Sequence, residues 1–211
     1  MGMAGIGYSV RKSIDDFEIG DLDGAMMHAC NAFDGTSRKL HPEMRKHQRR
    51  FTQTLREHYY IFGPMALPNI NLETTFWPAK VSDQQKTTDR PDIADLVYGI
   101  HRCTHGHGDE LPEGFELIPD ASNKASTTSI IASAGKIRLS DRTIFGLLGI
   151  AVLCPLNSGL QVPDGYHLTF AGEVLMINDW WGRAADFKTL VEKQNLIRVK
   201  LDLEDWFNEI N

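Results

Sequence analysis

The residues best suited to chemistry are concentrated between positions 101 and 110 of the 211-residue chain. This segment reads His-Arg-Cys-Thr-His-Gly-His-Gly-Asp-Glu and holds three of the eight histidines, so its density of reactive groups is unusual. Histidine titrates near neutral pH and can act as a general acid or base. Arginine stays charged and binds phosphate oxygens through two parallel hydrogen bonds. The residue types therefore suit proton transfer and phosphate binding.

A metal site is one interpretation of this segment. The run His105-Gly106-His107-Gly108-Asp109 is similar to the HxHxD motif of the metallo-β-lactamase hydrolases, and Cys103 could supply a further zinc ligand. The next residue is Glu110 rather than the histidine of that motif, and only His167 lies downstream. A metal-binding hydrolase is therefore the weaker alternative, and we predict no metal and no other cofactor.

A polar helix end is a second interpretation, because histidine and glycine often occupy the turn after a helix and Arg102 could bond the last carbonyls. The apolar residues Ile93, Leu96 and Ile100 recur at helical spacing before this segment, and Pro91 suits the first turn of a helix. The pattern predicts a helix that carries Arg102 at its C-terminal end.

Upstream of this helix the sequence predicts two longer helices. The first opens at the Asp21 region and ends near Leu40, and the second runs from Glu43 to Phe62 and stops at Gly63-Pro64. Between residues 38 and 58 there are seven Lys or Arg residues against two Glu, a local charge of +5, while the remainder of the chain carries −11. Such a basic stripe attracts phosphates even in an acidic protein, although an ordinary solvated helix face has the same composition.

Residues 69–88, which precede the helix that carries Arg102, are predicted as a long connection. Downstream of that helix we predict short strands, and a hairpin and a closing helix near the C-terminus. The expected strands are 115–118, 129–132, 136–139, 166–170 and 173–177, and the expected helices are 140–154 and 184–194.

The composition, with 42% hydrophobic and 24% charged residues, is that of a folded protein. We predict one domain over 1–211, of the α+β class: mainly α, with small β additions. The longest apolar run has 11 residues, too few to cross a membrane, and no secretory signal is apparent. Three scattered cysteines favour a reduced, cytoplasmic protein. No nucleophile elbow, Walker loop or Cys-x2-Cys pair is present, which leaves serine hydrolases, P-loop NTPases and zinc ribbons unsupported.

The order of these features resembles the HEPN superfamily of helical nucleotide-binding domains. Its signature is an arginine followed after four to six residues by a histidine, and Arg102 and His107 match the shortest spacing. The Ala-rich stretch Leu22–Phe33 resembles the first long helix of that family. The resemblance covers residues 13–110 as a helical core, with 111–211 as a β-hairpin and helix elaboration packed on it.

The resemblance implies an antiparallel helical bundle that forms a homodimer and acts on RNA. Many HEPN proteins are metal-independent endoribonucleases, some of them in prokaryotic defence or toxin–antitoxin systems with an antitoxin partner. It assigns phosphate binding to Arg102 and proton transfer to His107, with His105 as a second candidate. The residues then expected to guide the RNA backbone are Arg45, Lys46, Arg49 and Arg50. A catalytically silent module that binds RNA, nucleotides or a protein partner is the open alternative, because active members commonly carry a polar residue where this chain has Cys103.

Overall fold

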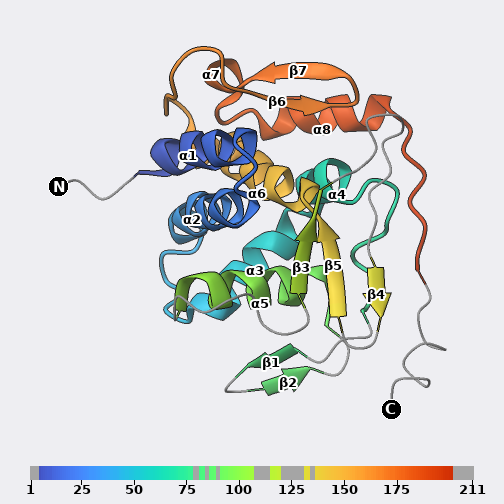
Figure 1. The fold of residues 1–211 in the computed structure, drawn as a ribbon. Helices are drawn as coiled ribbons and strands as arrows, with labels where there is room; N and C mark the ends of the chain where they lie inside the picture. Colours follow the sequence, from blue (N-terminus) through green and yellow to red (C-terminus); the bar gives the residue numbers. More distant parts are fainter. Residues whose placement is uncertain are drawn as a thin grey trace.

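The computed structural model describes residues 5–77, 81–83, 86–88, 91–106, 115–119, 131–133 and 136–201. Within this part the protein is mainly helical with small sheets, which confirms the predicted α+β class. Figure 1 shows the helices packed around α6, with short strands at the periphery. The helices are α1 (Ile6–Glu18), α2 (Leu22–Leu40), α3 (His47–Glu57), α4 (Tyr59–Ala66), α5 (Ile93–Gly106), α6 (Arg142–Leu153), α7 (Ile177–Trp180) and α8 (Ala184–Lys193).

Helices α1 and α2 form a tight hairpin. Gly20, with a φ of +82°, allows the sharp turn between them, and the Asp21 side chain caps α2 by accepting from the Gly24 N–H at 2.9 Å. The buried Ser13 hydroxyl donates to the Ala25 carbonyl at 2.7 Å and joins the two helices. Helix α1 begins at Ile6. The helical structure thus starts before Ser13, the residue at which the resemblance to the HEPN superfamily starts.

Helix α6 is the centre of the core. Its residues from Ile144 to Leu153 are buried with the exception of Phe145, which is half-buried, and it contacts α1, α2 and α4. Gly146 permits close packing against α4, since a Cβ built there would lie 2.7 Å from the Phe62 ring and 2.8 Å from the Ala66 Cβ. An apolar helix buried on nearly all sides is stabilised mainly by removal of its surface from water.

The basic second helix that we predicted is broken in two. At His58 the backbone leaves helical geometry, with φ −115° and ψ 22°, and separates α3 from α4. Gly63-Pro64 does not end the helix as expected, because α4 continues to Ala66 with Pro64 inside it. Proline removes one backbone hydrogen bond there, and the burial of α4 against α6 offsets that loss.

The strands in the described part of the chain form three small sheets. β3 (Phe115–Ile118) pairs in parallel with β5 (Lys136–Ser140), and β4 (Ile131–Ser133) pairs antiparallel with β5. β1 (Val81–Asp83) and β2 (Lys86–Thr88) form an antiparallel pair inside the segment that we predicted as a connection, so that prediction was wrong.

The predicted C-terminal hairpin and closing helix are confirmed. β6 (His167–Phe170) pairs with β7 (Glu173–Met176), and the turn residues Ala171 and Gly172 both have positive φ, as a type I′ hairpin turn requires. The hairpin lies along α8 (Figure 1). The Phe170 ring at the end of β6 packs against the Phe187 ring of α8, with 5.0 Å between the centroids. Beyond α8 the chain returns to the α4–β1 connection, and the Val199 N–H donates to the Asn69 carbonyl at 2.8 Å.

One hydrophobic cluster extends from Val10 in α1 to Val191 in α8. Within the described ranges no helix combines the length and the apolar character needed to cross a membrane.

Candidate functional site

The predicted Arg–His segment falls at the end of α5. Arg102 and His105 belong to the last turns of this helix, of which the structure describes the backbone, and the predicted helix before Arg102 is confirmed. His107, the predicted proton-transfer group, lies outside the described residues, as do Asp109 and Glu110. The described side chains that lie near this segment come from α2 and α3, and α3 packs against α5.

Two contacts fix how α5 lies against α3. The Arg56 guanidinium at the C-terminal end of α3 contacts the carboxylates of Asp92 at 2.6 Å and Asp95 at 2.9 Å, at the start of α5. His47, the first residue of α3, lies with its Nδ1 3.5 Å from the hydroxyl of Tyr98 in the middle of α5. The two helices are therefore antiparallel, and the turn of α5 after Tyr98 is level with the residues that precede His47.

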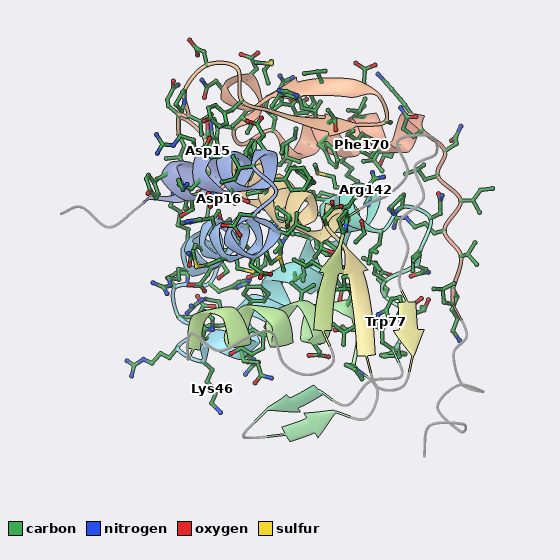
Figure 2. All side chains as sticks on the ribbon, viewed as in Figure 1. Asp15, Asp16, Lys46, Trp77, Arg142 and Phe170 are labelled. Atoms are coloured by element: carbon green, nitrogen blue, oxygen red, sulfur yellow. The ribbon has the colours of Figure 1, made fainter. Side chains whose placement is uncertain are left out.

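This register brings the predicted segment to the basic stripe. Arg102 follows Tyr98 by four residues, so the two positions share one face of α5. The segment that precedes His47 contains Arg45 and Lys46, and Figure 2 shows Lys46 at the lower left of the molecule. Sequence reasoning could not have placed these groups together, because the register of α3 against α5 is a tertiary contact.

Five described cations at this end of the molecule are exposed to solvent. One of them, Lys39, donates to the Leu156 carbonyl at 3.2 Å and to the Asn157 side chain at 2.9 Å, which leaves four. They come from the last turns of α2, from the α2–α3 connection and from the first turn of α3. We call this group the basic end; its members are Arg38, Arg45, Lys46 and Arg49.

Arg50 does not belong to the exposed group, although we predicted it as a phosphate contact. Its side chain is 10% exposed, and its guanidinium donates to the Asp34 carboxylate at 3.0 Å, the Met44 carbonyl at 3.0 Å and the Ser37 hydroxyl at 3.3 Å. All of these partners are protein groups, so Arg50 links α3 to α2. The structure thus gives Arg50 a buried structural position.

Asp34 is the acceptor at the centre of the site. Besides Arg50, its carboxylate contacts the His47 Nε2 at 2.9 Å and the Arg38 guanidinium at 2.7 Å, and the side chain is only 9% exposed. Burial by itself would raise the Asp34 pKa, but hydrogen bonds from His47 and Arg50, with the charges of His47 and Arg38, hold it well below its ordinary value. Asp34 therefore stays ionised throughout the physiological pH range.

Aromatic packing holds the imidazole of His47 in place. The Phe51 ring lies 4.5 Å from Phe33 and 5.5 Å from Tyr98, centroid to centroid, and the His47 and Tyr98 ring centroids are 5.8 Å apart. His47 thus has an aromatic wall on one side and the Asp34 carboxylate on another. Its side chain nevertheless remains 38% exposed at the basic end.

Sequence analysis assigned no role to Asp34, His47 or Tyr98. The four-residue spacing of Asp34 and Arg38 in one helix is a signal that could have identified their ion pair. Nothing local in the sequence indicates that His47 and Tyr98 meet.

Among the side chains that the structure describes, no three or more His, Cys, Asp or Glu residues are grouped as a metal ion would need. The side chains of Cys103 and His105 and the whole of His107, which would form the HxHxD-like site, are outside that description.

Comparison with known proteins gives a family for the whole chain. A family model described as Rv1289 matches residues 5–207. The chain belongs to the Rv1289 family. Its relatives include the uncharacterized protein Rv1289 of Mycobacterium tuberculosis (strain H37Rv) and the uncharacterized protein Mb1320 of Mycobacterium bovis. Each is 40% identical over 203 residues, which is 96% of this chain and 95% of the relative.

The Rv1289 family match spans both the predicted helical core and the C-terminal elaboration, so the similarity covers nearly the whole chain. No solved structure matches the chain.

Proposed function

We propose that the protein is a HEPN-like RNA-binding protein that cleaves RNA without a metal ion. The observation that carries the proposal is the gathering of four exposed cations at the end of the molecule where α5 carries Arg102. An RNA backbone presents a row of phosphates, and several cations on one surface can neutralise a number of them at once. The acidic charge of the rest of the chain restricts phosphate binding to this end.

The ion pairs of Asp34 support this role. The Asp34 carboxylate forms ion pairs with Arg50 and Arg38. Its negative charge is therefore neutralised by these two residues and does not cancel the positive charge of Arg45, Lys46 and Arg49. Arg102 would hold the phosphate to be cleaved, and His107 would move protons, with His105 as the second candidate. As in other HEPN proteins, a homodimer would bring two such pairs into one cleft, in a defence or toxin–antitoxin setting.

The binding part of the proposal is tested with a triple variant, Arg45→Ala/Lys46→Ala/Arg49→Ala. The matched control is Lys188→Ala/Lys193→Ala/Lys200→Ala, which removes the same charge from exposed positions on α8 and the C-terminal segment. Fluorescence anisotropy with a labelled 20-nucleotide RNA is measured at several salt concentrations.

The slope of log K against log salt is negative, and each phosphate contact contributes roughly −0.7 for a single strand. Loss of three contacts should therefore make the slope less negative by about 2. The control should keep the wild-type slope. Equal slopes for wild type and the basic-end variant, or equal losses in the two triple variants, would refute RNA binding at the basic end.

The cleavage part is tested in the presence of a chelator. We expect wild-type protein to cut the RNA and both Arg102→Ala and His107→Ala to abolish cutting. Equal activity in wild type and both variants would show a contaminating nuclease. Binding without cleavage would instead identify a catalytically silent module, the alternative that the Cys103 position favours.

A further inference from the structure

An open cavity of about 400 Å³ lies between α1, α6 and β6. It is on the side of the molecule that carries the β6–β7 hairpin, away from α3 and α5 (Figure 1). Its lining comes from three parts of the chain: Ile14, Phe17 and Glu18 of α1, Phe145 of α6, and residues 164–169. Small-molecule sites have volumes of roughly 300–1,000 Å³. The cavity therefore has room for a small aromatic compound.

Aromatic rings form much of the cavity wall. The Phe17 and Phe145 rings pack edge to face with 4.7 Å between their centroids, and both are only partly buried. The partly buried Tyr166 joins the hairpin to α1, because its hydroxyl donates to the Asp15 carboxylate. This hydrogen bond raises the pKa of Tyr166, so the phenol stays neutral. The Arg11 Nε lies 3.7 Å from the same carboxylate, so Asp15 has a cationic partner of its own.

Two carboxylates, those of Glu18 and Asp164, also line the cavity. Glu18, the last residue of α1, is exposed, and its carboxylate has neither an ion pair nor a hydrogen bond with any residue that the structure describes. The Asp164 carboxylate accepts a hydrogen bond from the Asn178 amide at 3.3 Å. The imidazole of His167 donates from Nδ1 to the Gly165 carbonyl at 3.1 Å. No lysine or arginine is among the lining residues, so the two carboxylates have no cation on the described cavity wall.

We propose that this cavity binds a small organic cation, namely a protonated amine attached to an aromatic or alkyl body. The ammonium group forms an ion pair with Glu18, and the negative faces of the Phe17 and Phe145 rings attract the same charge. The body of the ligand covers the apolar wall, and removal of that surface from water favours binding. An anion would be repelled by the two carboxylates, so the site discriminates by charge. The cavity is separate from the basic end, and the inference does not depend on RNA binding.

Three compounds that share a phenyl ring separate the effect of charge from that of shape. At pH 7, 2-phenylethylamine is a cation, 2-phenylethanol is neutral and phenylacetate is an anion. Binding to the full chain is measured by isothermal titration calorimetry at physiological salt. We expect one site for the amine with a Kd of about 1 mM, a value within reach of a ligand with about nine non-hydrogen atoms. The alcohol should bind about fivefold more weakly, as the loss of an exposed ion pair implies, and phenylacetate should bind most weakly.

The main variant is Glu18→Gln, which removes the unpaired charge from an exposed position. The matched control is Glu192→Gln, which changes an exposed carboxylate in the last turn of α8. Glu18→Gln should weaken binding of the amine about fivefold and bring it to the affinity of the alcohol, whereas the control should keep the wild-type ratio. Phe17→Leu keeps an apolar side chain but removes the ring, and should weaken binding of the amine about two- to fivefold.

Equal affinities for the three compounds, or no saturable binding of any of them up to about 10 mM, would overturn the proposal. An amine affinity that Glu18→Gln leaves unchanged would also overturn it, because the amine would then bind elsewhere. Equal losses in Glu18→Gln and Glu192→Gln would have the same consequence, since attraction to the net negative charge of the chain would then explain the binding.

Discussion

Asp34→Asn tests whether the buried carboxylate holds the basic end together. The amide keeps the size of the side chain but removes the negative charge that faces Arg50, His47 and Arg38. The loss of the ion pair destabilises Arg50 more than His47 or Arg38, because the Arg50 side chain is 10% exposed and cannot regain full hydration without a structural change. Breaking a buried ion pair from one side typically costs about 3–5 kcal/mol. Arg50 keeps its bonds to Ser37 and Met44, so we expect the lower limit, about 3 kcal/mol.

A decrease of this size in the free energy of unfolding is measurable as a shift of the denaturant midpoint and as a fall in Tm of roughly 6–12 °C for a chain of this length. Asp186→Asn is the matched control, because Asp186 forms an exposed ion pair with Arg183 and should change the free energy of unfolding by less than about 0.5 kcal/mol. The double variant Asp34→Leu/Arg50→Met removes both buried charges and should recover most of the loss.

The same carboxylate predicts a pH dependence. Its pKa is lower in the folded protein than in the unfolded chain, so its contribution to stability is fully present above the unfolded value of about 4 and is lost as pH falls through the folded value. The difference in the free energy of unfolding between wild type and Asp34→Asn should therefore be constant from about pH 5 to pH 8 and shrink below about pH 4. A gap under about 0.5 kcal/mol at pH 7, or a double variant as unstable as the sum of the single variants, would refute this account of the site.

Two further predictions concern the core. Gly146→Ala should lower stability by about 1–3 kcal/mol in denaturant unfolding, because the new methyl group meets the Phe62 ring at 2.7 Å. Gly149→Ala meets the flexible side chain of Met65, so it should lower stability less. Both variants gain about 1 kcal/mol of helix propensity, so the order of the two depends on packing, and the reverse order would contradict the packing described for α6. Burial raises the pKa of the Cys30 thiol, so alkylation at pH 8 followed by peptide mapping should find Cys30 labelled far more slowly in native than in unfolded protein, and equal rates would show that the site opens freely.

The elements that the sequence predicted well have strong local signals. The helix that carries Arg102, the hairpin with the Ala171-Gly172 turn and the closing helix 184–193 all follow from periodicity and turn chemistry. The pair β1–β2 was missed because strands of three residues are stabilised by their partner and leave little pattern in the sequence. The break at His58 was missed because the apolar positions on both sides of it are compatible with one continuous helix.

The site was less predictable than the elements. Sequence reasoning identified the basic stripe and the Arg102 segment separately, and the antiparallel register of α3 and α5 brings them to one end. It could not tell that Arg50 turns inward and Arg49 outward, because the difference depends on Asp34 in another helix. A titratable residue such as His47 acquires its surroundings only through tertiary packing.

The position of α6 has a consequence for synthesis on the ribosome. Helices α2 and α4 pack against α6, yet the chain reaches α4 at Tyr59 and does not reach α6 until Arg142. A nascent chain that has emerged only as far as α5 therefore carries apolar helix faces whose partner has not been translated. At about 5–20 residues per second this exposure lasts several seconds, long enough for chaperone binding or misassociation. Completion of the core, in which α6 contacts α1, α2 and α4, must wait for α6 to leave the exit tunnel.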